Sequence, residues 1–231
     1  MKLLIVIPAY NEEANIKTTV SKLRERCPQY DYVVVNDGSR DGTTAICRKE
    51  GFNLVDLPIN IGLAGAVQTG MQYGYLQDYD AVLQYDGDGQ HEPEYIEALC
   101  DAMIKDNADI VIGSRFIEEK KPFTPRMMGS TLIQFLLRLV SGVKLTDPTS
   151  GMRLFGKKLI KEFAQNMNYG PEPDTLAYLM RSGAKVVEVP VKMSDRLEGE
   201  SYLNFTRSIR YMMHMCVSML IIVWFRRRPG V

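Results

Sequence analysis

Two aspartates, Asp86 and Asp88, stand two residues apart directly after the apolar run 81–85. In an extended chain, side chains at positions i and i+2 point to the same face, so both carboxylates are directed at one place. Two like charges at such a short separation are unfavourable unless a cation lies between them. Carboxylate oxygens suit Mg²⁺ or Mn²⁺, and Mg²⁺ is commonly bound together with phosphate. The pair therefore favours a metal bridge to a diphosphate, although a solvated turn would use the same residue types.

Polar, glycine-bearing or charged segments also follow the other strands predicted in the first half of the chain. They are PAYNEE at 8–13, NDGSRDG at 36–42, PINIG at 58–62 and GSR at 113–115. Ligands of open α/β sheets bind beyond the carboxyl ends of the strands, so these segments would meet at one edge of the sheet. Their convergence strengthens the interpretation of Asp86 and Asp88 as a metal and diphosphate site.

Each of these segments has more than one interpretation. Asp37 either belongs to a turn that caps the next helix or accepts hydrogen bonds from a nucleotide base. Tyr10 lies either at a plain strand end or against a base or ribose. Asn60 and Gly62 either only begin a helix or also present its N-terminus to phosphate. We expect His91, beside the aspartate pair, to be a surface residue rather than a support for the metal ligands.

Composition and missing motifs exclude several other classes. The chain has 28 Lys and Arg against 28 Asp and Glu, so no overall basic charge favours nucleic acid. Neither a G-x-G-x-x-G motif nor a P-loop motif is present. The apolar run 3–7 has only the length of a strand, so we expect no signal peptide. Four scattered cysteines predict reduced thiols, not a disulfide framework or a zinc site: Cys27, Cys47, Cys100 and Cys216.

Strands and helices alternate through the first half of the chain. Apolar runs predict strands at 3–7, 32–35, 53–57, 81–85 and 109–113. Amphipathic or small-residue-rich segments predict helices at 12–26, 41–49, 62–76 and 94–105. The second half is predicted to contain helices at 126–143, 157–164 and 172–182 and strands at 152–155 and 185–193. This order predicts an α/β fold, a mostly parallel twisted sheet with helices on both faces.

The chain ends in an apolar segment, 211–225, that lies between arginines and contains Trp224. A helix of this length spans roughly 22 Å, which is less than the ~30 Å hydrocarbon core of a bilayer. Basic flanks and an interfacial Trp predict a helix that lies on or partly in a membrane. The alternative is a helix packed on the domain core or in an oligomer interface. We expect one catalytic domain at 1–202 and a membrane-associated or oligomerising helix within 203–231.

Four motifs, VIPAYNEE at 6–13, VNDGS at 35–39, NIG at 60–62 and DGDGQ at 86–90, together carry a family resemblance. The chain resembles the family 2 glycosyltransferases of GT-A fold. Within them it is most similar to the polyprenyl-phosphate sugar transferases, the dolichyl-phosphate mannose synthase group, over residues 1–202. Further support comes from GSR at 113–115, Arg126 with Ser130, EVPV at 188–191 and R-x-x-G-x-S at 196–201.

The resemblance implies an inverting transferase that moves a sugar from a nucleotide-sugar to a polyprenyl phosphate at the cytoplasmic face of a membrane, with Mg²⁺ or Mn²⁺. The nucleotide-sugar would be bound by Pro8, Tyr10, Asn11, Glu12, Asp37, Asn60, Asp86, Gly87, Asp88 and Arg115. The metal would be bound by Asp86, Asp88 and Gln90. The acceptor phosphate would be bound by Arg126, Ser130, Arg196 and Ser201. Catalysis would rest on Asp88, Arg115, Arg126 and Arg196.

A phosphate acceptor is already an anion near neutral pH, so such an enzyme needs positioning and charge stabilisation more than a general base. Members of the family that act on hydroxyls need a carboxylate base, and Glu172 and Asp174 lie where one would be expected. We interpret them as structural residues or sugar contacts. The group usually has Lys where this chain has Tyr202. Many of its members carry two or more long transmembrane helices, whereas this chain has one marginal segment, so we expect either a small membrane-protein partner or a position on the bilayer through amphipathic helices. A homo-oligomer formed through the apolar C-terminal helix is a further expectation.

The donor base and three rival functions stay open at this stage. Asp37 would serve either uridine or guanosine, and we favour a UDP-sugar. One rival is a glycosyltransferase that extends a saccharide hydroxyl, and a nucleotidyltransferase would use a similar metal and sheet. A rival of another class is a non-catalytic subunit that only docks a partner, which the complete DGDGQ motif disfavours.

Overall fold

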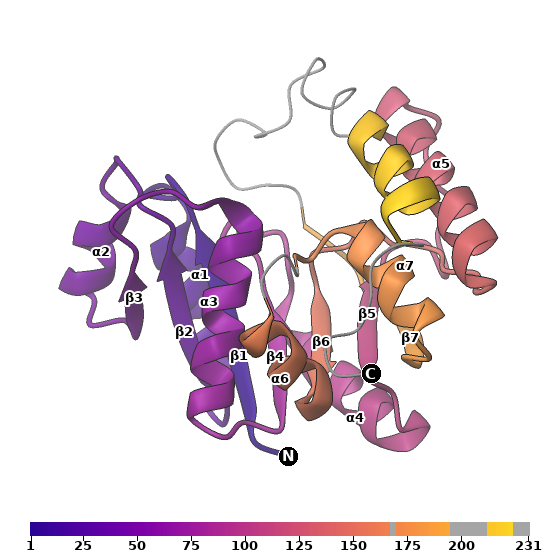
Figure 1. The fold of residues 1–231 in the computed structure, drawn as a ribbon. Coiled ribbons are helices and arrows are strands. Elements are labelled where there is room, and N and C mark those ends of the chain that lie inside the picture. The colour runs from indigo at the N-terminus through magenta and orange to yellow at the C-terminus, as the bar shows by residue number, and fades with distance from the viewer. Residues whose placement is uncertain (167–169, 195–211, 224–231) are drawn as a thin grey trace.

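The computed structural model describes residues 1–166, 170–194 and 212–223. In these residues seven strands form one sheet, in the order β3-β2-β1-β4-β6-β5-β7 (Figure 1). The strands are β1 Leu3–Ala9, β2 Asp31–Asn36, β3 Leu54–Asp56, β4 Ala81–Gln84, β5 Ile110–Ser114, β6 Arg153–Gly156 and β7 Val186–Pro190. The helices are α1 Ile16–Arg26, α2 Thr43–Lys49, α3 Gly62–Leu76, α4 Ile96–Asp106, α5 Pro125–Ser141, α6 Lys157–Gln165 and α7 Pro173–Arg181.

The sheet is mostly parallel, as predicted, with one exception that matters for the site. Strand β1 pairs in parallel with β2 and β4, β2 pairs in parallel with β3, and β5 pairs in parallel with β7. Strand β6 lies antiparallel between β4 and β5. Because β6 runs in the opposite direction, the loop that precedes it lies at the edge where β4 and β5 end. The segment 146–151 therefore joins the polar loops at that edge.

Helices cover both faces of the sheet, which confirms the predicted α/β class. One buried cluster joins β1 to α1 and α4, through residues such as Ile5, Ile16 and Leu99. The other joins the opposite face to α3, α5, α6 and α7, through residues such as Met71, Phe163 and Leu179. The sheet is thus enclosed between two apolar layers, and its carboxyl edge carries the polar residues.

Several predicted helices begin one to four residues later than expected, and two of these deviations have a clear local cause. The helix expected from residue 12 begins at Ile16, because the chain first makes a turn in which the carbonyl of Glu12 accepts from the backbone N–H groups of Asn15 and Ile16. The helix expected from residue 94 is preceded by the 3-10 turn η1, Pro93–Tyr95, and becomes α-helical at Ile96. The first deviation leaves residues 10–13 available to the site.

The C-terminal helix, residues 212–223, packs against the domain and lies beside α5 (yellow in Figure 1). It includes the π-helical segment η2, Ser218–Ile222. Its Met215, Met219 and Val223 are buried in the same cluster as α5 and α7, and the Ser218 hydroxyl donates to Asp174. No helix within the described residues combines the length and the apolar character needed to cross a membrane. The boundary predicted at residue 202 lies outside the described residues and stays a prediction.

Candidate active site

A pocket of about 290 Å³ opens at the carboxyl ends of β1, β2 and β4. It is lined by Pro8, Ala9, Tyr10, Glu12, Asp37, Asn60, Gly62, Leu63, Ala66, Asp86, Gly87 and Asp88. Eight of the ten residues predicted to bind a nucleotide-sugar are in this lining, and the two outside it are Asn11 and Arg115. We call this cavity the donor pocket. It joins loops that are far apart in the sequence, as the predicted sheet edge required.

Asp37 is buried in the wall of the donor pocket and also holds the start of α3. Its Oδ1 accepts from the Ile61 backbone N–H at 2.7 Å, and its Oδ2 accepts from that of Gly62 at 2.8 Å. The capping interpretation was thus right in kind, but the helix that receives the cap is α3 rather than the next helix, α2. The reason is that β2 and β3 are neighbours, so the loops that follow them meet. Each oxygen still has a lone pair that could face a base.

The loop that follows β1 is fastened to the loop that follows β2. The Asn11 backbone N–H donates to the Ser39 hydroxyl, and Asn11 Oδ1 accepts from the Arg40 N–H, both at 2.9 Å. The Glu12 N–H donates to the Thr43 hydroxyl at 2.9 Å. Asn11 has a positive φ of 55°, a conformation that Asn tolerates better than most residues. Asn11 therefore shapes the wall of the donor pocket from outside it.

The carboxylate of Asp86 is held at both oxygens. Gln84 Nε2 donates to its Oδ1 at 3.0 Å, and His91 Nε2 lies 3.2 Å from its Oδ2. His91 is only 2 % exposed, so the prediction of a surface histidine was wrong. After the turn at Gly89, which has a φ of 79°, the chain folds back and the His91 ring packs 5.5 Å from that of Tyr85. The position of His91 close to Asp86 in the sequence did not indicate that the chain reverses at Gly89 and buries the ring.

The surroundings of Asp86 favour its ionised form. Burial opposes ionisation, but the hydrogen bonds from His91 and Gln84 and the charge of Arg153 outweigh it, so the pKa of Asp86 is below its usual value. A Cβ placed on Gly151 would lie 2.0 Å from Asp86 Oδ2. Only glycine at this position lets the segment 146–151 pass so close to the carboxylate.

The donor set at this edge of the sheet suits a hard divalent cation. Asp86 and Asp88 both line the donor pocket, and anionic carboxylate oxygens are the preferred ligands of Mg²⁺ and Mn²⁺. Gln90 donates its backbone N–H to Asp88 Oδ1 at 3.1 Å, and its Nε2 lies 3.5 Å from the Ser194 carbonyl oxygen. In the described part of the chain, no group of three or more His, Cys, Asp or Glu is arranged to hold a metal. Mg²⁺ sites in proteins commonly combine one or two carboxylates with ligand phosphates, and this donor set fits that pattern.

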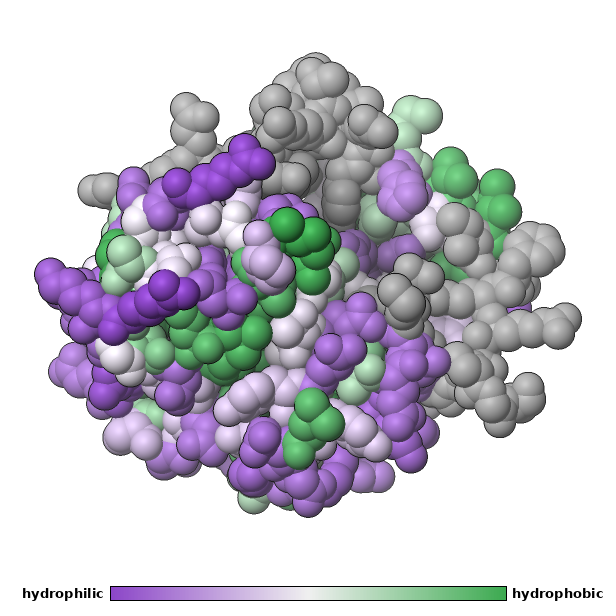
Figure 2. All heavy atoms as spheres, turned by 60° about the vertical axis from the view of Figure 1, so that its left-hand side comes forward, coloured by the Kyte–Doolittle hydropathy of each residue, from purple (hydrophilic) through white to green (hydrophobic). Residues whose placement is uncertain are grey.

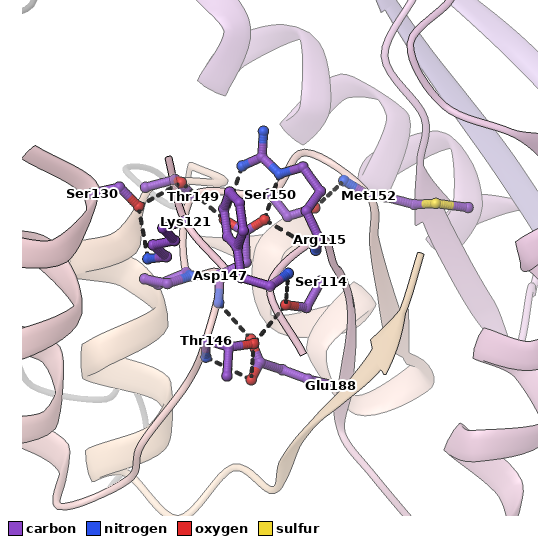
Figure 3. Close-up of polar contacts among 12 residues, drawn as sticks. Ser114, Arg115, Lys121, Ser130, Thr146, Asp147, Thr149, Ser150, Met152 and Glu188 are labelled. Atoms are coloured by element: carbon purple, nitrogen blue, oxygen red, sulfur yellow. Dashed lines mark hydrogen bonds and ion pairs between the residues drawn. The ribbon is translucent and has the colours of Figure 1, made fainter. Parts of the chain in front are cut away.

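Arg115 is anchored to the segment 146–151 rather than directed into the donor pocket. Its Nε and Nη2 donate to the two carboxylate oxygens of Asp147 at 2.6 and 2.9 Å (Figure 3). Asp147 is fully buried, and its backbone N–H donates to Glu188 Oε1 at 2.7 Å. Arg115 lines a separate hollow that also contains Glu118 and Glu119. Its predicted contact with the donor stays a prediction, while its bidentate pair with Asp147 fixes the loop.

The residues predicted for the acceptor phosphate are placed only in part. Ser130 is 5 % exposed, and its hydroxyl lies 3.4 Å from that of Thr149 and 3.2 Å from the Lys121 ammonium. Arg126 is in the first turn of α5, but its side chain lies outside the described part. Arg196 and Ser201 also lie outside the described residues.

Sequence reasoning missed several residues that organise the site. Arg153 is buried, and its guanidinium donates to the carbonyls of Pro148, Ser150 and Pro171, which ties two loops together. The other missed residues are Gln84, Lys121 and Asp147, while His91 was considered but expected at the surface. For Asp147 the sequence carried a signal, the turn DPTSG at 147–151, but nothing in it identified the partner as Arg115.

Glu172, which the sequence placed where a base would be expected, has a pKa above its usual value. Burial is the main cause, and the charge of Asp174 is the next.

Comparison with known proteins agrees with this geometry. The family model described as Glycosyl transferase family 2 matches residues 4–163. The undecaprenyl-phosphate mannosyltransferase of Micrococcus luteus is 32 % identical and covers 90 % of this chain and 93 % of its own length. A UDP-N-acetylglucosamine--dolichyl-phosphate N-acetylglucosaminyltransferase of Methanococcus voltae is 30 % identical, over 81 % of this chain and 84 % of its own.

A solved structure supports the same fold. Glucosyl-3-phosphoglycerate synthase of Mycobacterium tuberculosis, in complex with Mn²⁺, UDP-glucose and phosphoglyceric acid, matches with a TM-score of 0.67 at 18 % identity. The match covers 94 % of this chain and 79 % of the synthase. The similarity extends over the whole α/β unit, so the fold is GT-A. Together with the family model and the donor pocket, these matches show that the chain is a glycosyltransferase that belongs to glycosyl transferase family 2.

Proposed function

We propose that this enzyme transfers a sugar from a nucleotide-sugar to the phosphate of a polyprenyl phosphate, with inversion at the sugar carbon. The observation that carries the proposal is the donor pocket, where Asp86 and Asp88 lie at one sheet edge with Tyr10 and Asp37. The acceptor class is supported by the relatives from Micrococcus luteus and Methanococcus voltae, whose names specify undecaprenyl and dolichyl phosphate.

The donor we favour is a UDP-sugar. Asp37 lines the pocket and accepts two backbone hydrogen bonds, and its remaining lone pairs would suit a ring N–H, which both uridine and guanosine offer. The Methanococcus voltae relative is named for a UDP-sugar, and the solved synthase was crystallised with UDP-glucose. The two relatives differ in their sugar, mannose or N-acetylglucosamine, so the sugar is left to experiment.

The reaction needs charge stabilisation rather than a base. An oxygen of the acceptor phosphate attacks the sugar C1, and the bond from C1 to the nucleoside diphosphate breaks with its electron pair on the leaving oxygen. Asp86, Asp88 and, as predicted, Gln90 would hold Mg²⁺ or Mn²⁺, which when bound neutralises charge on the leaving diphosphate. Gln84 and His91 hold Asp86 in place for this role. Because the attacking oxygen is already anionic, no proton has to be removed.

One side of the molecule suits contact with a membrane, where a polyprenyl phosphate would be found. Helix α5 and the adjacent C-terminal helix each have an exposed apolar stripe. The stripes consist of Met128, Leu132, Phe135 and Leu139 on α5 and of Met213, Val217, Leu220 and Ile221 on the C-terminal helix. Figure 2 shows the side of the molecule that carries α2 and β3. This side is mainly hydrophilic, and separate hydrophobic patches lie among the hydrophilic residues. Exposed apolar surface of this extent is typical of an interaction site.

This surface supports a peripheral position on the membrane. Ser130, the predicted acceptor-phosphate residue, lies on the buried side of α5, one of the two helices that carry the stripes. The cytoplasmic face, a small membrane-protein partner and a homo-oligomer stay predictions from the sequence.

The test is a transfer assay with the purified chain. UDP- and GDP-sugars are supplied with undecaprenyl or dolichyl phosphate in vesicles, with Mg²⁺ or Mn²⁺, and with the matching polyprenol as a control acceptor. With the polyprenyl phosphates we expect sugar transfer and release of nucleoside diphosphate. With the polyprenol we expect neither. Release of pyrophosphate would instead indicate a nucleotidyltransferase.

A second candidate acceptor class, a saccharide hydroxyl, is favoured by one observation. Glu172 is largely buried, and burial together with Asp174 raises its pKa, as suits a general base. Addition of saccharide acceptors to the same assay separates the candidates. Transfer to saccharides but not to polyprenyl phosphates would replace our proposal with this one.

A further inference from the structure

The ammonium of Lys121 is fixed in place between β5 and α5. Its Nζ lies 3.2 Å from Ser130 Oγ and 3.2 Å from Gln134 Oε1. It also lies 5.1 Å from the centre of the Phe116 ring, within the range of a cation–π contact. Figure 3 shows Lys121 pointing toward Ser130 beside the Arg115–Asp147 pair. Contacts from two sides therefore hold this charge at one position.

The charge of Lys121 is not balanced by an ion pair in the described part of the chain, since both hydrogen-bond partners are neutral oxygens. Two carboxylates act on it from a distance, and both are engaged elsewhere. Asp147 is paired with Arg115, and Glu188 accepts from the backbone N–H groups of residues 146 and 147. Burial lowers the pKa of Lys121 below its usual value. An anion at this position would offset that desolvation.

Lys121 and the predicted metal ligands lie against the same loop. The Ser130 hydroxyl is 3.4 Å from that of Thr149. Two residues further on, Gly151 lies directly against the Asp86 carboxylate. The loop 146–151 therefore links the Ser130 and Lys121 contact at Thr149 to the Asp86 carboxylate at Gly151.

We propose that Lys121 and Ser130 together bind the phosphate group of the acceptor, with Lys121 donating to a phosphate oxygen. This inference rests on the proposed function and names a residue that sequence reasoning did not select. A phosphate there would accept hydrogen bonds from the Lys121 ammonium and the Ser130 hydroxyl. The nearby carboxylates, Asp147 and Glu188, already have other partners. Hydrogen bonds from a charged donor to a phosphate are stronger than those between neutral groups. Arg115, by contrast, is paired with Asp147 in this structure.

The test compares steady-state kinetics of Lys121→Gln and wild type with undecaprenyl phosphate in detergent micelles and the nucleotide-sugar that the wild type uses. We expect the KM for undecaprenyl phosphate to rise about 10-fold or more, the usual effect of losing a hydrogen bond to a charged group. The KM for the nucleotide-sugar is expected to stay within about 2-fold, which also reports that the donor pocket is folded. Lys121→Arg keeps the charge and should recover most of the loss. Lys120→Gln, at the exposed neighbour, is the matched control.

The outcomes separate this inference from the function on which it rests. If the wild type transfers no sugar to either undecaprenyl or dolichyl phosphate, both proposals fail. If the wild type is active and Lys121→Gln has an unchanged KM for undecaprenyl phosphate, the assignment of Lys121 alone is overturned. Equal losses in Lys121→Gln and Lys121→Arg would show a structural role and would overturn it as well.

Discussion

At the scale of single residues, the site depends on carboxylates that are kept in defined charge states. The pKa of Asp86 is lowered despite burial, because His91 and Gln84 donate hydrogen bonds to it. The pKa of Glu172 is raised by burial and by Asp174. The first carboxylate is thus prepared to bind a cation, and the second resists ionisation.

His91 is predicted to act on metal binding through Asp86. In His91→Phe an aromatic ring still packs at this position but the hydrogen bond to Asp86 Oδ2 is lost, so we expect the dissociation constant for Mn²⁺ with bound nucleoside diphosphate to rise about 10-fold. Mn²⁺ binding is measured by electron paramagnetic resonance, independently of turnover. Exposed His214→Phe is the matched control. An unchanged Mn²⁺ affinity in His91→Phe would contradict the positioning role.

Glu172 is predicted to make stability depend on pH. Its folded pKa lies above its unfolded value, so its favourable contribution is complete below the unfolded pKa and is lost as pH rises through the folded pKa. Glu172→Gln, which cannot ionise, should therefore gain stability relative to wild type as pH rises from about 4 to 8. Urea unfolding at several pH values measures the difference. A difference that is constant across this range would refute the shifted pKa.

At the scale of elements, the loop before β6 connects the separate parts of the site. It is held by Arg115 and Arg153 and passes directly over Asp86 at Gly151. This arrangement requires β6 to run antiparallel between β4 and β5, because only then does the loop lie at the carboxyl edge of the sheet.

The buried pair Arg115–Asp147 is predicted to be the main anchor of that loop. Asp147→Ala leaves the Arg115 guanidinium without its buried carboxylate partner, so we expect the free energy of unfolding to fall by about 3 kcal/mol. Urea denaturation measures this loss. Asp80→Ala, at an exposed aspartate that lies 3.7 Å from Lys157, is the control and should change stability far less. Equal effects of the two substitutions would argue against the anchor.

Local patterns in the sequence predicted most of these elements, and long-range partners account for what they missed. Continuous apolar runs identified the strands, and the polar segments after them identified the donor pocket, since both signals are local. The burial of His91 depends on a chain reversal, and the pairing of Arg115 with Asp147 joins residues 32 positions apart. The antiparallel insertion of β6 and the cap that Asp37 gives to α3 likewise depend on strand order, which periodicity does not encode.

At the scale of the whole molecule, Ser130 of the proposed acceptor site lies on α5, one of the two helices that carry the exposed apolar stripes. Phe135→Glu places a charge in the α5 stripe and removes the burial of one aromatic ring, worth about 2 kcal/mol, so vesicle binding should weaken at least 10-fold. Vesicle flotation measures the binding. Ile104→Glu changes an equally exposed side chain on α4 and is the control. Equal loss of binding in both variants would show that the stripe is not the membrane contact.

The most direct test of the central claim is the rate of sugar transfer to undecaprenyl phosphate by the wild type and by Asp88→Asn. The account places Asp88 in the donor pocket as a metal and diphosphate ligand, so the wild type should form the polyprenyl-phosphate sugar and the variant should be at least ~100-fold slower. Thermal unfolding of the variant near the wild-type temperature serves as the folding control. A folded Asp88→Asn that transfers sugar at the wild-type rate would contradict the account.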